Sequence, residues 1–559
     1  FVKNDFLRAV ENNASKKKLQ QLFLQTRLAY KKIEWAAEYF MPLSAIEVNG
    51  APVPEIQASE FPGSAPLVTQ PQGLQVIEAL LFPSYDTSKK NELIDRINLL
   101  QNSCDKFKTR FQDIAILNWQ VFDAIKLEVF RVITLGITGF DAPVSLNSIE
   151  EAACALTDLK IVFPLYLQHQ NAPHVLNMIN AAIDYLQVHK NDFNGFDRAK
   201  FIADYANPVS TEISNLEKSL HIHTVHYNRL LRQRANTLFD TDAFDVNDYV
   251  ASFNDSATDK KIALGHLLFS DPVLSDNKVR SCQTCHQPDK AYTDGLVKNT
   301  VFNSSKLLPR NTPTLLNAAL QPALFDDSRA TTLEEQAKDV IENKNEMHGS
   351  LEKAATLLWN DEKYKRLFSE AFPIKNRTNI SPYEIQNALG SFIRSLVKLN
   401  SRFDEYMRGN KNAMAGNEVN GFNLFMGKAK CGTCHYMPLF NGTPPPKFSR
   451  IESEIIGVPQ SNAQNAHLDT DMGRYNIIKD DFNKHAFKTP TVRNSSKTAP
   501  YMHNGVFTTL EQVMDFYNKG GGHGLGLQID NQTLPFDKLD LNQSEINDII
   551  AFMKALDSK

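Results

Sequence analysis

The chain has 559 residues, of which 22% are charged, and its formal net charge is −4. That length exceeds what one hydrophobic core usually supports, so roughly two to four domains are expected. The weakly acidic balance argues against a nucleic-acid partner, which would need a basic face. The most apolar stretch, residues 127–139, is interrupted by Glu128 and Arg131, so no membrane span is expected.

Residues 1–235 place apolar side chains at the spacing of amphipathic helices. The clearest case includes Val175, Ile179 and Leu186, with Pro173 at its start. Alternation typical of strands is rare. The sequence therefore predicts a mostly α protein that begins with a helical bundle. Weaker helical stripes cover residues 5–40, 90–108, 113–135 and 209–235.

A short motif in this bundle, Gly73-x-Gln75-x-x-Glu78, resembles the G-x-H-x-x-E block of the imelysin-like helical domains found on bacterial surfaces. Residues 34–42 are also similar to an early helix of that family. Gln75 stands where the family has His, so the resemblance implies a fold but no metal ion. A plain helical bundle that packs against the following domains is the alternative interpretation.

Three histidines, His221, His223 and His226, lie within the last predicted stripe. His223 and His226 would share one helix face, which suits a metal ion, but no carboxylate or cysteine accompanies them. Histidines at this spacing on a long helix are more often solvated. Metal binding is therefore the less favoured interpretation.

The chain changes character after the predicted bundle. Residues 236–255 belong to a stretch rich in Asp, Asn, Ser and Thr, which indicates a linker. Two further compact helical lobes are expected over residues 256–408 and 409–559. The segment from Asn542 to Leu556 has apolar residues at helical spacing and is predicted to close the second lobe.

Each of these lobes carries one C-x-x-C-H motif, at residues 282–286 and 431–435. This motif is typical of c-type haem attachment: the two thiols bond covalently to the haem, and the following His binds the iron. A zinc site would pair two C-x-x-C motifs at close spacing, whereas these lie far apart. Two covalently bound c-type haems are therefore predicted. Their attachment residues are Cys282, Cys285 and His286, and Cys431, Cys434 and His435.

The chain has six cysteines, so two lie outside the motifs. These two, Cys104 and Cys154, could form a disulfide or remain buried thiols, and the sequence leaves both open because disulfide geometry is three-dimensional. Covalent haem attachment takes place outside the bacterial cytoplasm, so we expect a periplasmic or cell-surface location. The start at Phe1 rather than Met is consistent with a removed signal peptide, and a lipid anchor upstream would not be visible.

Residues 256–559 resemble the bacterial di-haem cytochrome c peroxidase family, which includes the MauG-type enzymes. The resemblance implies two cytochrome c-like lobes, with a peroxidatic haem in the first and an electron-transfer haem in the second. Blocks similar to the family occur in the same order: LGHLLFSDPVLSDNKVRSCQTCH (264–286), RNTPTLLNA (310–318), DSRATTLEEQAKDVIENKNEM (327–347), DMGRY (471–475) and TPTVRNSSKTAPYMHNGVFTTLEQV (489–513).

The resemblance also implies catalytic residues at the first haem. Glu346 matches the distal carboxylate that works on bound peroxide, and Gln336 matches a second distal residue. Splitting the O–O bond needs a base that takes a proton and an acid that returns it. A buried carboxylate with a raised pKa suits both roles. The alternative is that Glu346 is one more acidic residue on a solvated helix.

A calcium ion between the haems is a further implication of the resemblance. Asn311 would supply a side-chain oxygen, and Thr498 and Pro500 would supply backbone carbonyls. Calcium accepts hard oxygen ligands together with water.

The chain departs from the family pattern around the first haem in two ways. Classical members carry a His in the loop after the first motif, but residues 287–325 contain none. His348, near Glu346, could approach the distal face but is not at the family position. The family tryptophan between the haems aligns with Asp326, beside Phe325.

A third departure concerns the second haem. The usual Met ligand aligns with Tyr517, as in the MauG-type branch, and Met514 is the rival ligand one helical turn away. Thioether ligation would give a higher potential than phenolate ligation. The aligned position favours Tyr517.

The resemblance implies an enzyme that reduces hydrogen peroxide to water with electrons from a small cytochrome c or cupredoxin. The closest alternative is a MauG-type oxidase that modifies a protein substrate. That alternative is supported by Tyr517 and the missing His, and weakened by the missing tryptophan. A third interpretation is a non-catalytic electron carrier or haem-iron acquisition protein, against which Glu346 and its block argue. The electron donor and the oligomeric state, a homodimer included, stay open.

Overall fold

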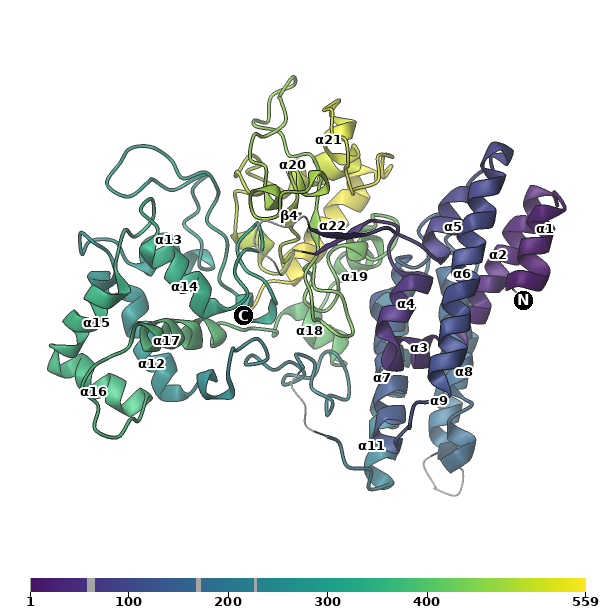
Figure 1. Cartoon of the computed structure of the whole chain (residues 1–559), viewed down its shortest axis with the longest axis horizontal. Coiled ribbons are helices and arrows are strands. Elements are labelled where there is room, and N and C mark those ends of the chain that lie inside the picture. Colours follow the sequence, from purple (N-terminus) through teal and green to yellow (C-terminus); the bar gives the residue numbers. More distant parts are fainter. Residues whose placement is uncertain (1, 58–65, 167–171, 226–228) are drawn as a thin grey trace.

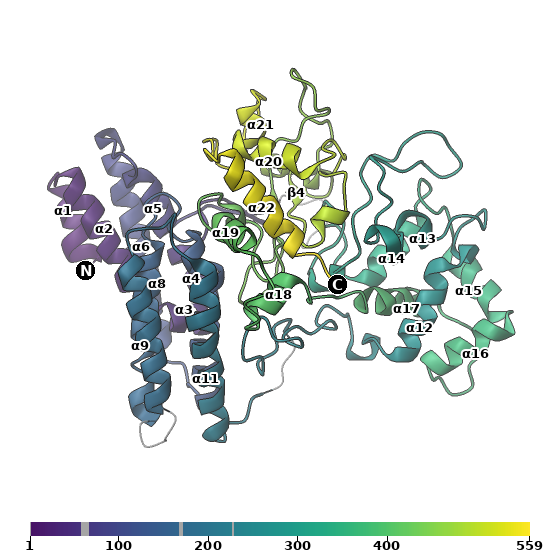
Figure 2. The same ribbon diagram turned by 180° about the vertical axis from the view of Figure 1, so that it is seen from behind.

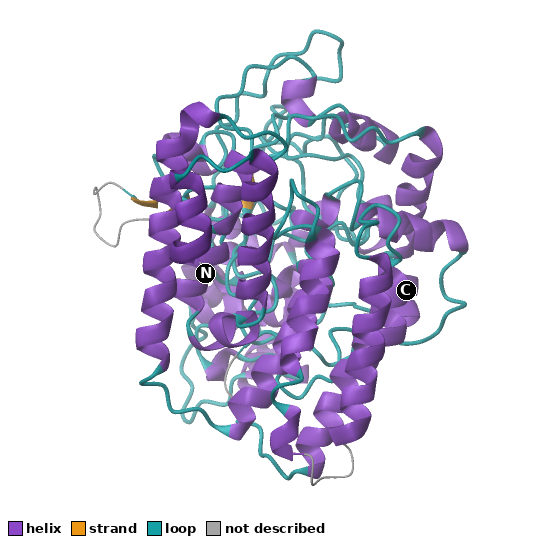
Figure 3. Cartoon of the chain, turned by 90° about the vertical axis from the view of Figure 1, so that its right-hand side faces the viewer, coloured by secondary structure: helices purple, strands orange, loops and turns teal. Residues whose placement is uncertain are grey.

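The structure of the chain is a computed structural model that describes residues 2–57, 66–166, 172–225 and 229–559. Helices joined by long loops make up most of these residues (Figure 3), so the mostly α fold expected from the sequence is confirmed. The described strands form two short antiparallel pairs. They are β1 (Glu55–Gln57) with β2 (Leu67–Thr69), and β3 (Ser453–Glu454) with β4 (Phe487–Lys488).

The N-terminal part is a set of roughly parallel and antiparallel helices at one end of the molecule (Figure 1). The helices are α1 (Arg8–Glu11), α2 (Lys16–Lys31), α3 (Glu34–Phe40), α4 (Pro42–Asn49), α5 (Leu74–Leu81), α6 (Lys90–Phe111), α7 (Asn118–Thr134), α8 (Ser148–Leu159), α9 (Ala172–His189), α10 (Arg198–Phe201) and α11 (Asn207–Ser219). Long helices such as α2, α6 and α9 bury one mainly apolar stripe each, as the sequence periodicity predicts, whereas α7 is buried on all sides from Phe122 to Thr134.

The helices around the first motif stand at the other end of the molecule, and those around the second motif lie between the two ends, as both Figure 1 and Figure 2 show. The first set is α12 (Asp259–Ser270), α13 (Cys282–Cys285), α14 (Leu333–Glu342), α15 (Leu351–Trp359), α16 (Glu362–Ala371) and α17 (Pro382–Arg394). The second set is α18 (Arg402–Met407), α19 (Gly416–Phe425), α20 (Leu510–Asn518), α21 (Gly521–Gly524) and α22 (Gln543–Ala555).

In each of the two lobes that carry a C-x-x-C-H motif, a glycine allows two helices to pack closely. A Cβ added to Gly265 of α12 would lie 1.9 Å from the carbonyl oxygen of Ala388 in α17. A Cβ added to Gly421 of α19 would lie 1.9 Å from the carbonyl oxygen of Asp548 in α22. Only glycine permits such an approach, because any side chain would collide with the facing backbone. The two lobes therefore repeat one helix crossing, in which the helix with the glycine precedes the motif and the facing helix follows it.

The first lobe has a hydrophobic core of its own, but the second lobe shares its core with the N-terminal helices. Residues of α12–α17 form a core of their own, with Leu268 and Phe368 at its centre. Helices α7–α11, in contrast, share one continuous core with α18–α22, which runs from Phe122 to Leu556. Polar contacts join the same two parts: Asn423 of α19 accepts from the backbone N–H of Ala199 at 2.9 Å. The second lobe and half of the N-terminal helices are thus one packed unit.

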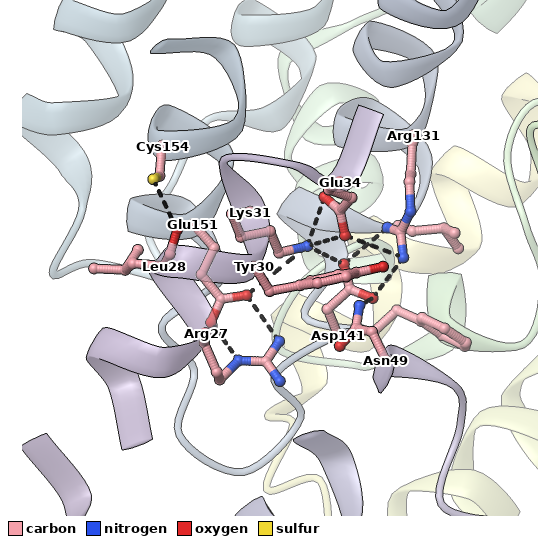
Figure 4. A network of polar contacts seen from close by, with 12 residues as sticks. Arg27, Leu28, Tyr30, Lys31, Glu34, Asn49, Arg131, Asp141, Glu151 and Cys154 are labelled. Carbon is pink, nitrogen blue, oxygen red and sulfur yellow. Dashed lines mark hydrogen bonds and ion pairs between the residues drawn. The ribbon is translucent and has the colours of Figure 1, made fainter. Parts of the chain in front are cut away.

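The interior of the N-terminal helices contains a network of buried ion pairs (Figure 4). Arg131 donates to both carboxylate oxygens of Asp141, at 2.8 and 3.0 Å, and Lys31 donates to the same carboxylate at 2.6 Å. Arg27 and Glu151 form a second two-bonded pair, at 2.6 and 2.8 Å. Burial alone would raise the pKa of Asp141, but Arg131 and Lys31 hold that pKa well below its usual value. The network therefore locks α2, α7, α8 and the segment after α7 together.

The residues of the imelysin-like motif border this network. Gly73, at the start of α5, has φ 92°, and a Cβ there would lie 2.3 Å from the carbonyl oxygen of Val48. Gln75 donates to the carbonyl of Asn49 at 3.4 Å, and Glu78 accepts from the backbone N–H of Ser145 at 2.9 Å. These contacts give the motif a role in packing, and the family resemblance of this part stays a prediction.

One local expectation was wrong. The helix predicted over residues 209–235 ends at Ser219, so His221 and His223 follow it outside the helix, and His226 lies outside the described residues. Within the predicted linker, residues 236–255, Phe239 and Phe244 are buried in the shared core. The placing of the domain boundaries stays a prediction.

Two smaller points concern the cysteines and the membrane. Cys104 of α6 and Cys154 of α8 are free thiols, and Cys154 donates to the carbonyl of Leu28 at 3.3 Å. Within the described ranges, no helix is both long and apolar enough to cross a bilayer.

Candidate haem sites

The two C-x-x-C-H motifs fold into the same tight turn. In the first, which forms α13, the backbone N–H of His286 donates to the carbonyl of Cys282 at 2.9 Å. In the second, the N–H of His435 donates to the carbonyl of Cys431, also at 2.9 Å. A helical turn places side chains three residues apart on one face. Both motifs therefore present their two sulfurs side by side, as attachment to one porphyrin requires.

The two imidazoles are oriented by backbone carbonyls. Nδ1 of His286 lies 2.9 Å from the carbonyl oxygen of Tyr292, and Nδ1 of His435 lies 3.0 Å from that of Pro490. A carbonyl only accepts, so Nδ1 carries the proton and Nε2 is left to bind a metal. Burial lowers the pKa of both rings, that of His435 to about 4. Both are therefore neutral, as iron ligation requires, and they fit the haems that the motifs predict.

A cavity of about 660 Å³ opens beside the first motif. Its wall includes Cys282, Cys285 and His286 together with Gln336 and Glu346. Cofactor sites commonly enclose about 300–1,000 Å³. The structure thus brings the attachment residues and both predicted distal residues to one space of suitable size.

Glu346 is held in this wall by its neighbours. Asn343 Nδ2 donates to Oε1 of Glu346 at 2.7 Å, and Arg280 donates to the backbone carbonyl of Glu346 at 2.8 Å. Burial raises the pKa of the Glu346 carboxyl, which the charges of Arg329 and Arg280 and the Asn343 hydrogen bond only partly offset. A carboxyl with a raised pKa is suited to exchange protons near neutral pH.

Gln336 reaches the cavity from α14. This helix begins with a capping box, in which the backbone N–H of Glu335 donates to Thr332 Oγ1 at 3.2 Å and Thr332 N–H donates to Glu335 at 3.3 Å. His348 differs from both distal residues: its side chain is exposed, and its ring meets Phe302 edge-on. His348 is not part of the cavity wall.

Sequence reasoning missed Arg329 as a candidate site residue. Its guanidinium carbon lies 3.4 Å from the centre of the Phe325 ring, and it pairs with Asp327 at 3.0 Å. Arg329 lines the cavity together with Glu346. The only signal in the sequence was its place in the block at residues 327–347, because a lone Arg carries no motif.

The position of the family tryptophan is polar in this chain. Asp326 lies beside the cavity, and the backbone N–H of Lys488 in β4 donates to its carbonyl at 2.7 Å. Burial raises the pKa of the Asp326 carboxyl against the opposing charges of Arg310 and Lys488. Arg310 itself pairs with Asp471 at 2.7 Å. The two haem lobes thus meet through charged groups where the family has an indole ring.

Tyr517 of α20 lies near the second motif. Burial raises its pKa far above the usual value, and the neighbouring thiols of Cys431 and Cys434 add to the shift. Met514, one turn earlier, is buried in the shared core with 3% of its surface exposed. The electrostatic surroundings of Tyr517 therefore include both attachment cysteines, while Met514 contributes to packing.

Among the predicted calcium ligands, Asn311 of the first lobe contacts the second lobe. The side-chain amide of Asn311 donates to the carbonyl of Leu296 at 2.8 Å, so its oxygen faces elsewhere. The backbone N–H of Asn311 donates to the carbonyl of His503 at 2.7 Å, close in sequence to Thr498 and Pro500. Across the described part of the chain, no group of three or more His, Cys, Asp or Glu side chains could hold a metal. A calcium site here would therefore rest on amide and carbonyl oxygens.

Two attachment turns on helical lobes, each with an oriented neutral imidazole, define a di-haem protein of the c type. A sequence model of di-haem cytochrome c peroxidases matches residues 259–412. The methylamine utilization protein MauG of Methylorubrum extorquens is 34% identical over 301 residues, which cover 54% of this chain and 78% of that protein. The cytochrome c551 peroxidase of Nitrosomonas europaea is 30% identical over 293 residues, which cover 52% of this chain and 78% of that protein.

The chain therefore belongs to the di-haem cytochrome c peroxidase family that includes MauG, and this membership implies two c-type haems. Among solved structures, a MauG-like protein associated with microbial copper homeostasis is 27% identical. That match covers 55% of this chain and 92% of the other, with a TM-score of 0.48.

Proposed function

We propose that the protein is an exported di-haem peroxidase that reduces hydrogen peroxide to water with electrons from a small cytochrome c or cupredoxin. The observation that carries this proposal is Glu346, which lines the cavity beside His286 with a raised pKa. A simple electron carrier or haem-iron acquisition protein needs no such carboxyl. The periplasmic or cell-surface location follows from covalent haem attachment, which the motifs and the family both support.

The side chains around the cavity have distinct roles in this proposal. The haem on Cys282 and Cys285, when bound, supplies the iron that exchanges electrons with peroxide. Glu346 takes a proton from the first peroxide oxygen and returns it to the second as the O–O bond breaks. Gln336 orients the peroxide through its amide. Each H2O2 thereby takes up two electrons and two protons and leaves as two waters.

The second motif would be the point of electron entry. His435 and Tyr517 are the residues that would bind the iron of its haem, because Tyr517 stands at the family's ligand position and the thiols of Cys431 and Cys434 contribute to its pKa shift. Phenolate is an anionic ligand that stabilises ferric iron and lowers the potential. Asn311, Thr498 and Pro500 are proposed to hold a calcium ion that ties the two lobes together.

The experiment that tests this function is peroxide consumption by the purified di-haem protein with a reduced small cytochrome as donor. We expect two donor molecules to be oxidised per H2O2, with saturation in both substrates. Oxidation of the donor without peroxide consumption would contradict the proposal and favour an electron carrier.

A MauG-type protein oxidase is the second candidate. Tyr517 in place of Met supports it, as does the 34% identity to MauG. The polar Asp326 at the tryptophan position weighs against it, because long-range oxidation of a protein benefits from an aromatic relay between the haems. Stable oxidation of aromatic residues on a co-purified protein, with little turnover of a small donor, would favour this second candidate.

A further inference from the structure

Tyr436 directly follows the haem ligand His435 and is fully buried, with 0% of its surface exposed. Its hydroxyl donates to Oε2 of Glu452 at 2.6 Å. Its ring also meets Phe140 edge-on, with centroids 5.8 Å apart and planes at 71°. Tyr436 is thus held by the Glu452 carboxylate of its own lobe and by the Phe140 ring of the N-terminal part.

The position of Phe140 is fixed by its neighbour in the chain. Phe140 precedes Asp141, whose carboxylate accepts hydrogen bonds from Arg131, Lys31 and Asn49 in the buried ion network (Figure 4). Buried two-bonded ion pairs keep one geometry, since breaking them leaves an uncompensated charge. The backbone that carries the Phe140 ring is therefore fixed by the residue next to it.

The backbone around Tyr436 is fixed as well. Its N–H donates to the carbonyl of Asn441 at 2.8 Å, and the N–H of Phe440 donates to its carbonyl at 2.6 Å. His435, one peptide unit away, is oriented by the carbonyl of Pro490. Because adjacent residues share that peptide unit, the Tyr436 ring and the His435 imidazole are positioned by the same short stretch of backbone.

Glu452 also affects the second haem site through its charge. Its side chain is 24% exposed and lies 3.6 Å from Arg450, so the carboxylate is only partly screened. A negative charge close to an iron centre favours the more positive, oxidised state and so lowers the reduction potential. The 2.6 Å hydrogen bond from Tyr436 is one of the contacts that hold that carboxylate in place.

We infer that Tyr436 is a positioning residue through which Phe140 and Glu452 set the reduction potential of the second haem. The N-terminal helices are then a functional part of the electron-entry site rather than an appended module. This inference rests on the second haem of the proposed function.

The test is a redox titration of both haems by absorption in the purified holoprotein and its variants. Glu452→Gln should raise the potential of the second haem and leave the first unchanged. In a Tyr436→Phe background, the same Glu452→Gln change should have a smaller effect, because the hydroxyl no longer holds the carboxylate. Phe140→Leu should shift the potential of the second haem. Phe140→Tyr keeps an aromatic ring at this position and should leave that potential at the wild-type value. Tyr364→Phe, which removes a 2.5 Å hydrogen bond to Asp271 in the first lobe, is the matched control.

Haem content is measured first, because it tests the proposed function separately from the effect of Tyr436 on the second potential. A wild-type chain with only one covalent haem would count against the proposed function. Two intact haems with an unchanged second potential in Glu452→Gln or in Phe140→Leu would overturn the inference. Equal shifts at both haems, or a similar shift in Tyr364→Phe, would also overturn it, because they would indicate a general structural effect.

Discussion

Asn343 Nδ2 donates a 2.7 Å hydrogen bond to Oε1 of Glu346, three residues further along the chain. The turn that contains both residues follows directly after α14, so the end of that helix sets the direction of the Glu346 carboxyl. One carboxylate oxygen is occupied by this bond, and the other is free to exchange a proton. Fixing one oxygen gives the group a single orientation toward the cavity.

Glu346→Gln should slow the reaction with peroxide by roughly 10²–10⁴-fold, the usual contribution of general acid–base catalysis. Both haems and their reduction by the donor should be unaffected, because the donor acts at the other haem. Stopped-flow mixing with peroxide separates the two steps. His348→Gln, a change at an exposed position nearby, is the control. A wild-type rate for Glu346→Gln would show that the carboxyl is structural.

The same group predicts a pH dependence. Burial raises the pKa of Glu346, so its base form should be lost as the pH falls through a value above that of an ordinary Glu. The rate constant for peroxide should decline below that point. Arg329→Gln removes a charge that lowers this pKa, so it should move the decline to higher pH. Identical profiles for the wild type and Arg329→Gln would contradict this assignment.

The first haem should be five-coordinate or water-bound in the resting ferric protein. Residues 287–325 offer no imidazole, and His286 is the one histidine among the described residues that line the cavity. Peroxide should therefore react without prior reduction of the second haem. A purely low-spin resting spectrum at both haems, with activity only after one-electron reduction, would refute this expectation.

Tyr517→Phe should change the absorption and electron paramagnetic resonance spectra of the second haem and raise its potential, because an anionic ligand is lost. Met514→Leu, on the same helix, should change neither. A sulfur-to-iron charge-transfer band in the wild type, or spectra that respond only to Met514→Leu, would identify Met514 as the ligand instead.

Gly265→Ala and Gly421→Ala should each destabilise the lobe in which they lie by about 1–3 kcal/mol or more, as overpacking does. The new Cβ would lie 1.9 Å from a backbone oxygen in both cases, and a backbone cannot rotate away as a side chain can. Gly416→Ala, at the start of α19 with open space around it, should instead be neutral or stabilising by about 0.4–1 kcal/mol. Denaturant titrations followed at the haem bands measure this difference.

Asp404→Asn should destabilise the second lobe by about 3–5 kcal/mol, because it leaves the buried guanidinium of Arg493 unpaired. Arg493 donates to both oxygens of Asp404, at 2.9 and 2.7 Å. Burial raises the pKa of Asp404, but Arg493 outweighs it and holds that pKa below its usual value. The pair's contribution should be complete above the unfolded value of about 3.9 and lost as the pH falls through the lower folded value. Unfolding at pH 7 and pH 3 tests this, and equal stability of the variant and the wild type at pH 7 would contradict it.

The sequence predicted the chemistry of this chain better than its packing. The attachment residues could be found because C-x-x-C-H is a local motif, and Glu346 and Gln336 because they lie in an ordered block. The helix periodicity located α7 and α9, although the stripe expected over residues 113–135 begins before α7 does. The end of α11 at Ser219 was missed, because the following residues keep a helical spacing while they turn away. Arg329 was missed because a lone Arg carries no motif, and Tyr436 because its contact with Phe140 joins residues far apart in the sequence.

The core that joins α7–α11 to α18–α22 has a consequence for the order in which the chain folds. In sequence, the first haem lobe lies between the two halves of that core, with its own core between Leu264 and Leu396. During synthesis, the N-terminal helices must keep an apolar face uncovered until the last third of the chain has been made. Long-range closure of this kind is slow and exposes the intermediate to aggregation. The first lobe, in contrast, completes its core from neighbouring residues. We therefore expect the first lobe to fold early. The larger unit, formed by the N-terminal helices and the second lobe, should complete its core last.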